Sequence, residues 1–543
     1  MSAVDWIVLL GSLAAVTGYG LWKSRGSNTT SQYLLAGRTM PWYAMALSIM
    51  ATQASAITFI STTGQSFVDG MRFVQFYFGL PVAMIIIAAF FAPRFHASGV
   101  YTAYEYLERR FDTRTRAAVT LVFLLQRGLA VGVALYAPAI VLTSILGVPE
   151  SWTILLMGVL VVFYTVTGGI AAVTWTDFVQ MLIMTAGLLA ALITAIALLP
   201  GEVSFRGALA VAGAAGRLNA VTTTLDWNDR YNLWSGLIGG TFLALAYFGC
   251  DQSQVQRYLT GRNITQSKLS LLFNAAAKIP MQFFILFTGA MVFVFFTFVR
   301  PPAVFDPATL KAAQAQLGYA AAQERFDRAH DARRTAAQQV AAGGDAAAFQ
   351  TAQKEVDAAR REITKLGGGA ADTNYIFLSF VTKYMPVGIV GLIMAAIFAA
   401  AMSTISGEIN SLATVTIIDG YKRFLRPGAG DRSTLLASRW ATLFWGVYAV
   451  VTAQFGRSLG SLIEAVNMLG SLFYGGLLGV FSLAFFFPRC TAAGAFWGLL
   501  AGEAAILSAR YFTGIAFLWY NVLGCLTVIA VGMAVSLSHR AEK

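Results

Sequence analysis

Long apolar stretches are the feature that most constrains how this chain can fold. About thirteen of them are long enough to cross a lipid bilayer, and shorter polar segments separate them. A bilayer core has no water to satisfy backbone N–H and C=O groups, so single apolar runs of this length cross it as helices. The sequence therefore predicts an all-α polytopic membrane protein. The expected spans are approximately 4–22, 42–66, 72–93, 118–146, 152–171, 173–199, 232–256, 271–299, 387–421, 435–456, 461–487, 492–511 and 515–537.

Basic residues gather in the loops that follow odd-numbered spans. Loops rich in lysine and arginine remain in the cytoplasm, so the pattern predicts a cell-membrane protein with its N-terminus outside and its C-terminus in the cytoplasm. A bacterial inner membrane is the expected location. These loops account for much of the formal net charge of +12, and a nucleic-acid partner is not expected. The residues are Lys23, Arg25, Arg38, Arg94, Arg109, Arg110, Arg114, Arg116, Arg257, Arg262, Lys268, Lys422, Arg423, Arg426 and Arg432.

One segment does not belong to the membrane. Residues 301–369 are polar, rich in alanine and balanced in charge, and Gly343–Gly344 interrupts two strong helix-forming halves. This divides the chain into spans one to eight (1–300), an extracytoplasmic helical hairpin (301–369) and spans nine to thirteen (370–543). The charges of the hairpin are expected to be solvated helix faces without ligand chemistry.

A polar run from Met402 to Ser411 interrupts the ninth span. Hydroxyls, an amide and the carboxylate of Glu408 at bilayer depth need partners, and hard oxygen ligands suit an alkali cation. The run therefore predicts ion or substrate binding. The alternative is that the hydroxyls bond back to their own helix while Glu408 links two helices.

Two spans have the composition of broken helices. Thr58–Gly70 mixes polar residues and glycines where the second span should stay apolar, and Tyr247 and Gly249 precede the polar DQSQVQR (251–257) in the seventh span. Discontinuous helices that open the two halves of an inverted repeat are typical of transporters, with the substrate and ion sites near the midplane. The sequence contains no HExxH zinc motif and no Walker phosphate loop, so we expect a transporter and not an enzyme.

Several motifs together resemble the sodium:solute symporter family. They are WTDFVQ (175–180) after TGGIAAV, YFGCDQSQVQRYL (247–259), LYAPA (135–139) and the hydroxyl and amide pattern of the ninth span. The resemblance covers essentially all spans but not 301–369, and is closest to the iodide, multivitamin, monocarboxylate and sialic-acid branches. It implies the LeuT-type five-plus-five inverted repeat, with spans two to six and seven to eleven as the repeats, and Na⁺ as the coupling ion.

The resemblance also implies sodium ligands. The shared sodium site of the family falls on the carbonyls of Ala51, Ala54 and Ala400 and the hydroxyls of Ser403 and Thr404. A second site, present in some members, falls on Asp177 and Ser406. Gly407 replaces a hydroxyl there, and Glu408 is the residue that could compensate. For Asp177 the alternative is a cap or a salt bridge at the cytoplasmic end of its span.

The same resemblance bears on the solute. Positions that contact sugars in sugar-transporting members fall on Thr58, Tyr77, Leu80, Ala244 and Val466, most of which cannot hydrogen-bond a sugar ring. Arg127 is the only charge inside the fourth span, and its planar guanidinium matches a carboxylate. The alternative is a structural pair with Glu408, Glu464 or Asp177. The predicted substrate residues are Ser55, Thr58, Gln75, Tyr77, Arg127, Tyr247, Lys278, Glu464 and Asn467.

The sequence thus predicts a Na⁺-coupled symporter that imports a small organic solute by alternating access. The solute is expected to be an anionic carboxylate, such as sialic acid, a monocarboxylate or a vitamin-like acid. A sugar, polyol or inorganic-anion symporter and a transport-dead membrane sensor are the alternatives. The oligomeric state is not specified by the sequence.

Overall fold

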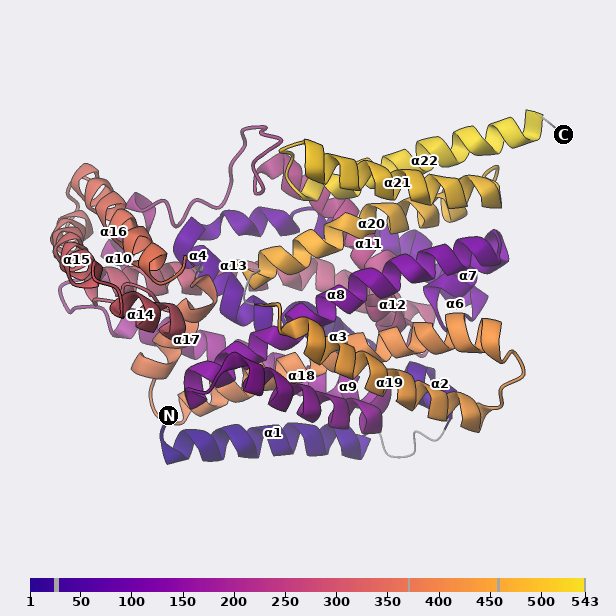
Figure 1. The fold of residues 1–543 in the computed structure, drawn as a ribbon, viewed down its shortest axis with the longest axis horizontal. Coiled ribbons are helices and arrows are strands. Elements are labelled where there is room, and N and C mark those ends of the chain that lie inside the picture. The colour runs from indigo at the N-terminus through magenta and orange to yellow at the C-terminus, as the bar shows by residue number, and fades with distance from the viewer. Residues whose placement is uncertain (24–28, 370–371, 457–459, 542–543) are drawn as a thin grey trace.

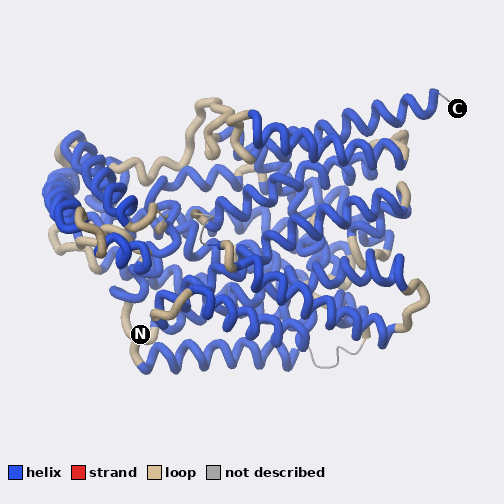
Figure 2. The backbone as a smooth tube through the Cα atoms, in the orientation of Figure 1, coloured by secondary structure: helices blue, strands red, loops and turns tan. Residues whose placement is uncertain are grey.

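The computed structural model describes residues 1–23, 29–369, 372–456 and 460–541, and in this part of the chain the secondary structure is helical (Figures 1 and 2). The prediction of an all-α membrane protein is confirmed. Arg25, one of the basic loop residues named above, lies outside the described residues. The helices are α1 (Ala3–Lys23), α2 (Thr30–Leu35), η1 (Ala36–Arg38), α3 (Trp42–Gln53), η2 (Thr58–Thr62), α4 (Thr63–Asp69), η3 (Gly70–Tyr77), α5 (Leu80–Ile86), η4 (Ile87–Phe91), α6 (Ala92–Ser98), α7 (Ala103–Arg110), α8 (Thr113–Leu146), α9 (Glu150–Ala197), α10 (Phe205–Ala214), η5 (Ser235–Gly239), α11 (Gly240–Gly249), α12 (Gln252–Leu259), α13 (Ile264–Phe298), α14 (Pro307–Gln314), α15 (Tyr319–Ala341), α16 (Ala347–Leu366), α17 (Thr373–Tyr384), α18 (Ile389–Val415), η6 (Thr416–Leu425), α19 (Asp431–Ala453), α20 (Leu462–Phe486), α21 (Ala492–Phe512) and α22 (Leu518–Ala541).

The membrane helices form one bundle, with α1 along one edge and α21 and α22 along the opposite edge (Figure 1). The helices α14 to α16 extend from one end of this bundle. Among the described residues, ten helical segments are long and apolar enough to span a membrane. Shorter apolar helices at 150–163 and 235–249 fall within the fifth and seventh predicted spans.

The helix α9 combines two predicted spans, 152–171 and 173–199. At 48 residues it would be about 70 Å long if straight, roughly twice the hydrocarbon core. The first turn of α9 lies at the end of the bundle from which α14 to α16 extend, because the hydroxyl of Tyr375 on α17 donates to Glu150 at 2.8 Å. Its end leads to α10, which packs on α15 at the same end. Trp175, in the middle of α9, lies at the opposite end of the bundle, where the ammonium of Lys23, the last residue of α1, is 4.9 Å from its ring centre. The segment therefore crosses the bundle twice, as the two predicted spans require.

Both predicted broken helices are present. The helix α3 ends at Gln53, and the chain passes through Ala54 and Ser55 before helical structure resumes. The helix α11 ends at Gly249, and α12 begins at Gln252. Each break leaves the terminal carbonyls of the first helix without the N–H donors that a continuous helix would supply.

The position of the first break differs from the prediction. The polar segment Thr58–Gly70 is helical as far as Asp69, so the break precedes it. Its hydroxyls find acceptors inside the protein: Thr63 Oγ1 donates to the carbonyl of Phe59 at 2.6 Å, and Ser66 Oγ donates to that of Leu286 on α13 at 2.6 Å. The polar side chains of this segment are therefore hydrogen-bonded within the protein and do not interrupt the helix.

The hairpin of α15 and α16 turns at Gly343, whose φ of +95° favours glycine. The hairpin is docked on the membrane helices. Arg333 of α15 donates to the carbonyl of Phe296, near the end of α13, at 2.8 Å, and Gln350 of α16 donates to that of Ala214 at 3.1 Å. The division of the chain into three parts remains a prediction, but the middle part is packed against the bundle and is not a free appendage.

His330 beside Arg333 makes this docking sensitive to pH. Its Nε2 lies 3.2 Å from the carbonyl oxygen of Phe296 and is the donor when the ring is neutral. Burial, together with the charges of Arg333 and Arg300, lowers the pKa of His330 from its ordinary value of 6.5 to about 4, against the smaller opposing effects of the hydrogen bond to Phe296 and of Asp331. Between pH 4 and pH 6.5, His330 is therefore protonated more often in the unfolded chain than in the folded protein. The contribution of neutral His330 is complete above pH 6.5 and is lost as the pH falls towards 4.

We expect the free energy that holds α15 on α13 to fall by about 2 kcal/mol between pH 7 and pH 5. Hydrogen-exchange protection factors of α15, corrected for intrinsic exchange at each pH, measure this change. His330→Gln keeps a donor for the carbonyl of Phe296 and should flatten the pH dependence. Equal protection of α15 at both pH values in the wild type would contradict this expectation.

Candidate functional site

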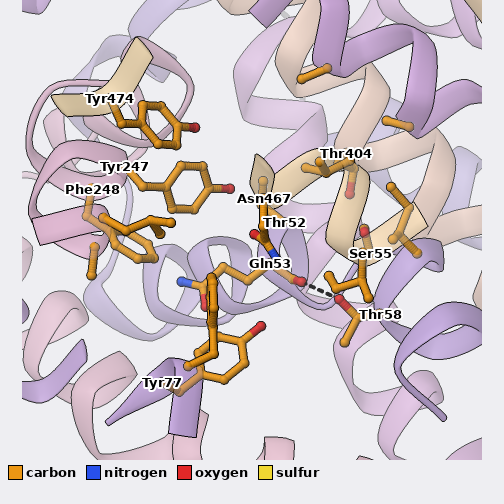
Figure 3. Close-up of a pocket in the computed structure, with 18 of the residues that line it drawn as sticks. Thr52, Gln53, Ser55, Thr58, Tyr77, Tyr247, Phe248, Thr404, Asn467 and Tyr474 are labelled. Atoms are coloured by element: carbon orange, nitrogen blue, oxygen red, sulfur yellow. Dashed lines mark hydrogen bonds between the residues drawn. The ribbon is translucent and has the colours of Figure 1, made fainter. Parts of the chain in front are cut away.

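A cavity of about 100 Å³ lies at the centre of the bundle, beside both helix breaks (Figure 3). It is bordered by the break after α3, by η3 and α5, and by α8, α11, α18 and α20. Its walls are mainly apolar and aromatic. The lining residues are Thr52, Gln53, Ser55, Ile57, Thr58, Phe76, Tyr77, Leu80, Arg127, Ala130, Ala134, Gly240, Leu243, Ala244, Tyr247, Phe248, Thr404, Glu408, Ile463, Val466, Asn467 and Tyr474.

Six of the nine predicted substrate residues line this cavity: Ser55, Thr58, Tyr77, Arg127, Tyr247 and Asn467. The positions aligned with sugar contacts also line it, and Leu80, Ala244 and Val466 give them apolar side chains. Figure 3 shows Gln53 and Asn467 between a wall that contains Tyr247 and Tyr474 and a corner that contains Ser55 and Thr404. Two amide donors therefore lie in an otherwise largely apolar chamber.

Gln53 and Asn467 keep unused hydrogen-bonding groups in this structure. Gln53 Nε2 and Asn467 Nδ2 are buried and have no partner among the described residues. The backbone carbonyl of Gln53 is engaged, because Thr58 Oγ1 donates to it at 2.6 Å (Figure 3). Buried amide N–H groups without partners are costly, so a bound acceptor would be favoured here. Gln53 is absent from the predicted substrate residues, although its place between the predicted sodium ligands Ala51 and Ala54 could have indicated it.

The other three predicted substrate residues lie outside the cavity lining. Gln75 holds an outer loop, since it donates to the carbonyl of Tyr231 at 2.8 Å and accepts from the N–H of Thr222 at 2.9 Å. Glu464 accepts from Arg230 at 2.7 Å and from the Tyr231 hydroxyl at 2.9 Å. Both side chains are therefore engaged by groups of the neighbouring loop and do not line the cavity, so their contact with the solute stays a prediction.

Lys278 lies behind the cavity wall. Its ammonium is fully buried on α13, 5.1 Å from the ring centre of Tyr77, and has no hydrogen-bond partner among the described residues. The face of Tyr77 supplies a cation–π contact in place of a counter-ion. Lys278 thus touches a lining residue without lining the cavity itself.

Arg127 is held by two carboxylates. Its Nη1 donates to Glu408 Oε1 at 2.9 Å, and its Nη2 donates to Asp251 Oδ2 and to the Tyr474 hydroxyl. The Tyr474 hydroxyl in turn donates to Asp251 at 3.1 Å, and the Tyr247 ring lies 5.6 Å from the guanidinium carbon. The pairing with Glu408 is one of the alternatives that the sequence left open.

This arrangement limits what Arg127 can do for a solute. The two Nη atoms are occupied, and Nε is the guanidinium nitrogen without a partner. Asp251, at the second helix break, was not among the predicted site residues. The acidic residue at the start of DQSQVQR is the signal that could have identified it. Arg127, Asp251, Glu408 and Tyr474 link α8, the second helix break, α18 and α20 at the wall of the cavity.

The five predicted ligands of the shared sodium site are all buried. Ala51 and Ala54 border the first break, while Ala400, Ser403 and Thr404 lie on α18, which packs on α3. The hydroxyl oxygens of Ser403 and Thr404 have no hydrogen-bond partner among the described residues. Neither hydroxyl bonds back to its own helix, in contrast to Ser411 and Thr414 about two to three turns later. Free hydroxyl oxygens and the carbonyl oxygens at a helix break are the ligands that a hard monovalent cation requires. The residues present therefore fit a sodium ion.

The predicted second sodium site is divided between two charge clusters. Asp177 accepts from Ser48 at 2.5 Å and lies 3.8 Å from the guanidinium of Arg257, whereas Glu408 pairs with Arg127. A side chain at Gly407 would collide with Arg257 Nη2, so the glycine makes room for that guanidinium. Among the described residues no hydrogen bond or ion pair joins Asp177, Ser406 and Glu408, and the second sodium site stays a prediction.

Comparison with known proteins agrees with this architecture. The model of the "Sodium:solute symporter family" matches residues 33–321 and 356–502. The human sodium-coupled monocarboxylate transporter 1 is 29% identical over 93% of this chain and 72% of its own length. The sodium/sialic acid symporter of Proteus mirabilis is 27% identical over 97% of this chain and 94% of its length.

A solved structure gives the same result in three dimensions. A substrate-bound, outward-open Na⁺-coupled sialic acid symporter superposes with a TM-score of 0.77, at 25% identity and over 98% of both chains. The predicted LeuT-type architecture is confirmed. The gap in the family match, residues 322–355, falls on the hairpin of α15 and α16.

Proposed function

We propose, since this chain belongs to the sodium:solute symporter family, that it couples sodium entry to the import of a small monocarboxylate. The chain is a multi-pass membrane protein, and its similar relatives are transporters of small solutes. Na⁺ would be held between the first helix break and α18 by Ala51, Ala54, Ala400, Ser403 and Thr404. When bound there, the cation would supply positive charge next to the solute cavity and favour the conformation that holds the solute.

The size of the central cavity is the observation that supports a small acid. A cavity of about 150 Å³ accommodates benzene, so the cavity of about 100 Å³ suits an acid of about two to four carbons. A nine-carbon sialic acid would require the walls to move apart. The apolar side chains of Leu80, Ala244 and Val466 suit a short alkyl group and offer nothing to sugar hydroxyls.

The carboxylate would lie between Gln53 and Asn467, whose amide N–H groups have no other acceptor. Arg127 lines the same cavity, and its Nε, which has no partner among the described residues, would be a third donor. Arg127 thus contributes one N–H and a positive charge that Asp251 and Glu408 offset. Ser55, Thr58, Tyr77 and Tyr247 would shape the remainder of the pocket, and Lys278 would act on it through the Tyr77 ring.

Uptake into sodium-free proteoliposomes, with and without sodium outside, tests this proposal. The panel contains radiolabelled acetate, propionate, lactate and pyruvate, compared with sialic acid, glucose and iodide. We expect inward sodium gradients to drive the short monocarboxylates most effectively. Preferred uptake of sialic acid, of a neutral sugar or of iodide would overturn the proposed solute class while leaving sodium coupling intact.

Asn467→Asp and Gln53→Glu are near-isosteric changes that replace an amide donor by a carboxylate. For an anionic solute each should raise the KM at least tenfold, because a hydrogen bond to a charged group worth about 1.5–3 kcal/mol is replaced by repulsion. Asn467→Leu and Gln53→Leu, which remove the donor without adding charge, should have smaller effects. An unchanged KM in both carboxylate variants would exclude this placement of the solute carboxylate.

We also propose that the hairpin end of the bundle faces outside. Basic residues gather at the other end, where Arg116 and Arg423 both pair with Glu108 and Arg110 donates to the carbonyls around Pro488. This is the distribution expected at the cytoplasmic face. The three native cysteines are buried. A cysteine introduced at Ala342 in the hairpin turn should therefore react with impermeant maleimide on intact cells, and protection of that cysteine would reverse the orientation.

A further inference from the structure

A second cavity, of about 290 Å³, lies where the hairpin meets the membrane helices. Its floor is formed by Phe67 and Val68 of α4 and Phe293 of α13, and its walls by the segment after α10 and by α15 and α16. Four arginines and two aspartates line it. These residues are Arg217, Arg333, Arg360, Arg361, Asp357 and Asp372.

The charges in this cavity are not balanced by its own carboxylates. Arg360 pairs with Asp372 at 3.0 Å. Among the described residues, no carboxylate lies within ion-pair distance of Arg217, Arg333 or Arg361. Asp357, the other acid, accepts a hydrogen bond from Gln353. The lining therefore contains more arginines than carboxylates.

Arg333 is the most deeply placed of these cations, with 3% of its surface exposed. Its Nη1 donates to Gln353 Oε1 at 3.1 Å and its Nη2 donates to the carbonyl of Phe296 at 2.8 Å, while its Nε is buried without a partner. Arg217 Nε is also buried without a partner. Two guanidiniums thus retain an unused N–H each.

Both of these guanidiniums lie near the ring of Phe293 and line the same cavity. The guanidinium carbon of Arg217 lies 4.8 Å from its centre and that of Arg333 lies 5.9 Å from it. Burial lowers the pKa of Arg333 to about 9, with Arg360 and Arg217 acting in the same direction and Asp357 opposing them. Burial also lowers the pKa of Arg217, against the opposing charges of Asp357 and Asp69. Keeping both buried guanidiniums charged costs desolvation free energy, and a bound anion would reduce that cost.

We propose that this cavity is a binding site for a small carboxylate anion bridged by Arg217 and Arg333, distinct from the central cavity. A planar carboxylate can accept from two guanidinium N–H groups at once, which a spherical anion cannot do with the same geometry. Arg333 and Gln353 belong to the hairpin segment outside the family match, so this site is specific to the chain's added hairpin. An occupied site would hold the hairpin against α4, the helix that follows the first break.

Calorimetric titration of the purified full-length protein with acetate and with succinate, in sodium-free HEPES buffer, tests the proposal. We expect saturable binding that does not require sodium and that persists in Asn467→Asp, in which the central cavity is altered. Arg217→Gln and Arg333→Gln should each weaken binding at least tenfold. Arg334→Gln, which changes the exposed neighbouring arginine, should not.

The readouts separate this site from alternatives. Hydrogen exchange of α15 shows whether Arg333→Gln keeps the hairpin docked, and Arg217→Gln, outside the hairpin, tests the site independently. Absence of saturable binding without sodium, or unchanged affinity in both Arg217→Gln and a folded Arg333→Gln, would overturn the proposal. Binding of sulfate or chloride in preference to both carboxylates would overturn the assigned ligand class.

Discussion

Replacing Arg127 by glutamine is expected to abolish transport and to destabilise the folded protein by about 3–5 kcal/mol. The change would remove the cation between Asp251 and Glu408, leaving two buried carboxylates without a counter-charge. Arg127→Lys should recover only part of the loss, because one ammonium cannot reproduce the planar contacts to Glu408, Asp251 and Tyr474. Thermal unfolding and sodium-driven uptake of each variant measure the two effects.

A compensating change distinguishes a structural counter-ion from a solute anchor. In Arg127→Gln/Glu408→Gln one buried carboxylate is removed with the cation, and Asp251 keeps the Tyr474 hydroxyl and the N–H of Ser253. The double variant should therefore be more stable than Arg127→Gln alone. Wild-type stability of the single variant would contradict the account of the Arg127 cluster, as would full activity of Arg127→Lys.

Removal of the free hydroxyls on α18 is the second large effect expected. Ser403→Ala and Thr404→Ala should each raise the sodium concentration for half-maximal uptake at least tenfold, while the unfolding temperature measured without sodium stays the same. Each hydroxyl has no protein partner to lose, so its removal costs nothing in the unliganded protein. Loss of a cation ligand worth about 1.4 kcal/mol or more gives the tenfold change.

The matched control is Thr414→Ala on the same helix. The Thr414 hydroxyl donates to the carbonyl of Asn410 at 2.7 Å, the back-bonded geometry that Ser403 and Thr404 do not have. Its removal should leave sodium dependence unchanged. If sodium half-saturation is the same in Ser403→Ala, Thr404→Ala and wild type, the proposed sodium site is wrong.

The architecture could be predicted because it rests on local signals. Apolar length defines the crossings, the polar residues around Tyr247 and Gly249 mark the second break, and Gly343–Gly344 marks the hairpin turn. The first break was expected too late in the chain. Hydroxyls in a helix look alike in sequence whether they bond to the preceding turn, as Thr63 does, or remain free, as Thr404 does.

The site was less predictable because it depends on which distant residues meet. Glu408 was among the expected partners of Arg127, but Asp251 was not, although it pairs with the same guanidinium. Gln75 and Glu464 occupy suitable spans, yet the loop around Tyr231 saturates both. That loop has no periodicity from which its position could be inferred.

The position of the hairpin also depends on contacts that the sequence does not reveal. Its helices follow from composition, but the burial of Arg333 does not, because a charged residue on a polar helix is normally expected to face water. The docking on α13 is set by tertiary contacts with Phe293 and Phe296, far away in sequence.

Concentrative uptake is the most direct test of the central claim that sodium entry drives carboxylate import through the cavity between the helix breaks. Proteoliposomes containing the wild-type protein would be given labelled propionate and an inward sodium gradient, and then a sodium ionophore. We expect propionate to accumulate above its external concentration, to leave when the ionophore dissipates the gradient, and not to accumulate in Thr404→Ala at the same sodium concentration. Accumulation that is equal with sodium, potassium or choline outside would contradict the account.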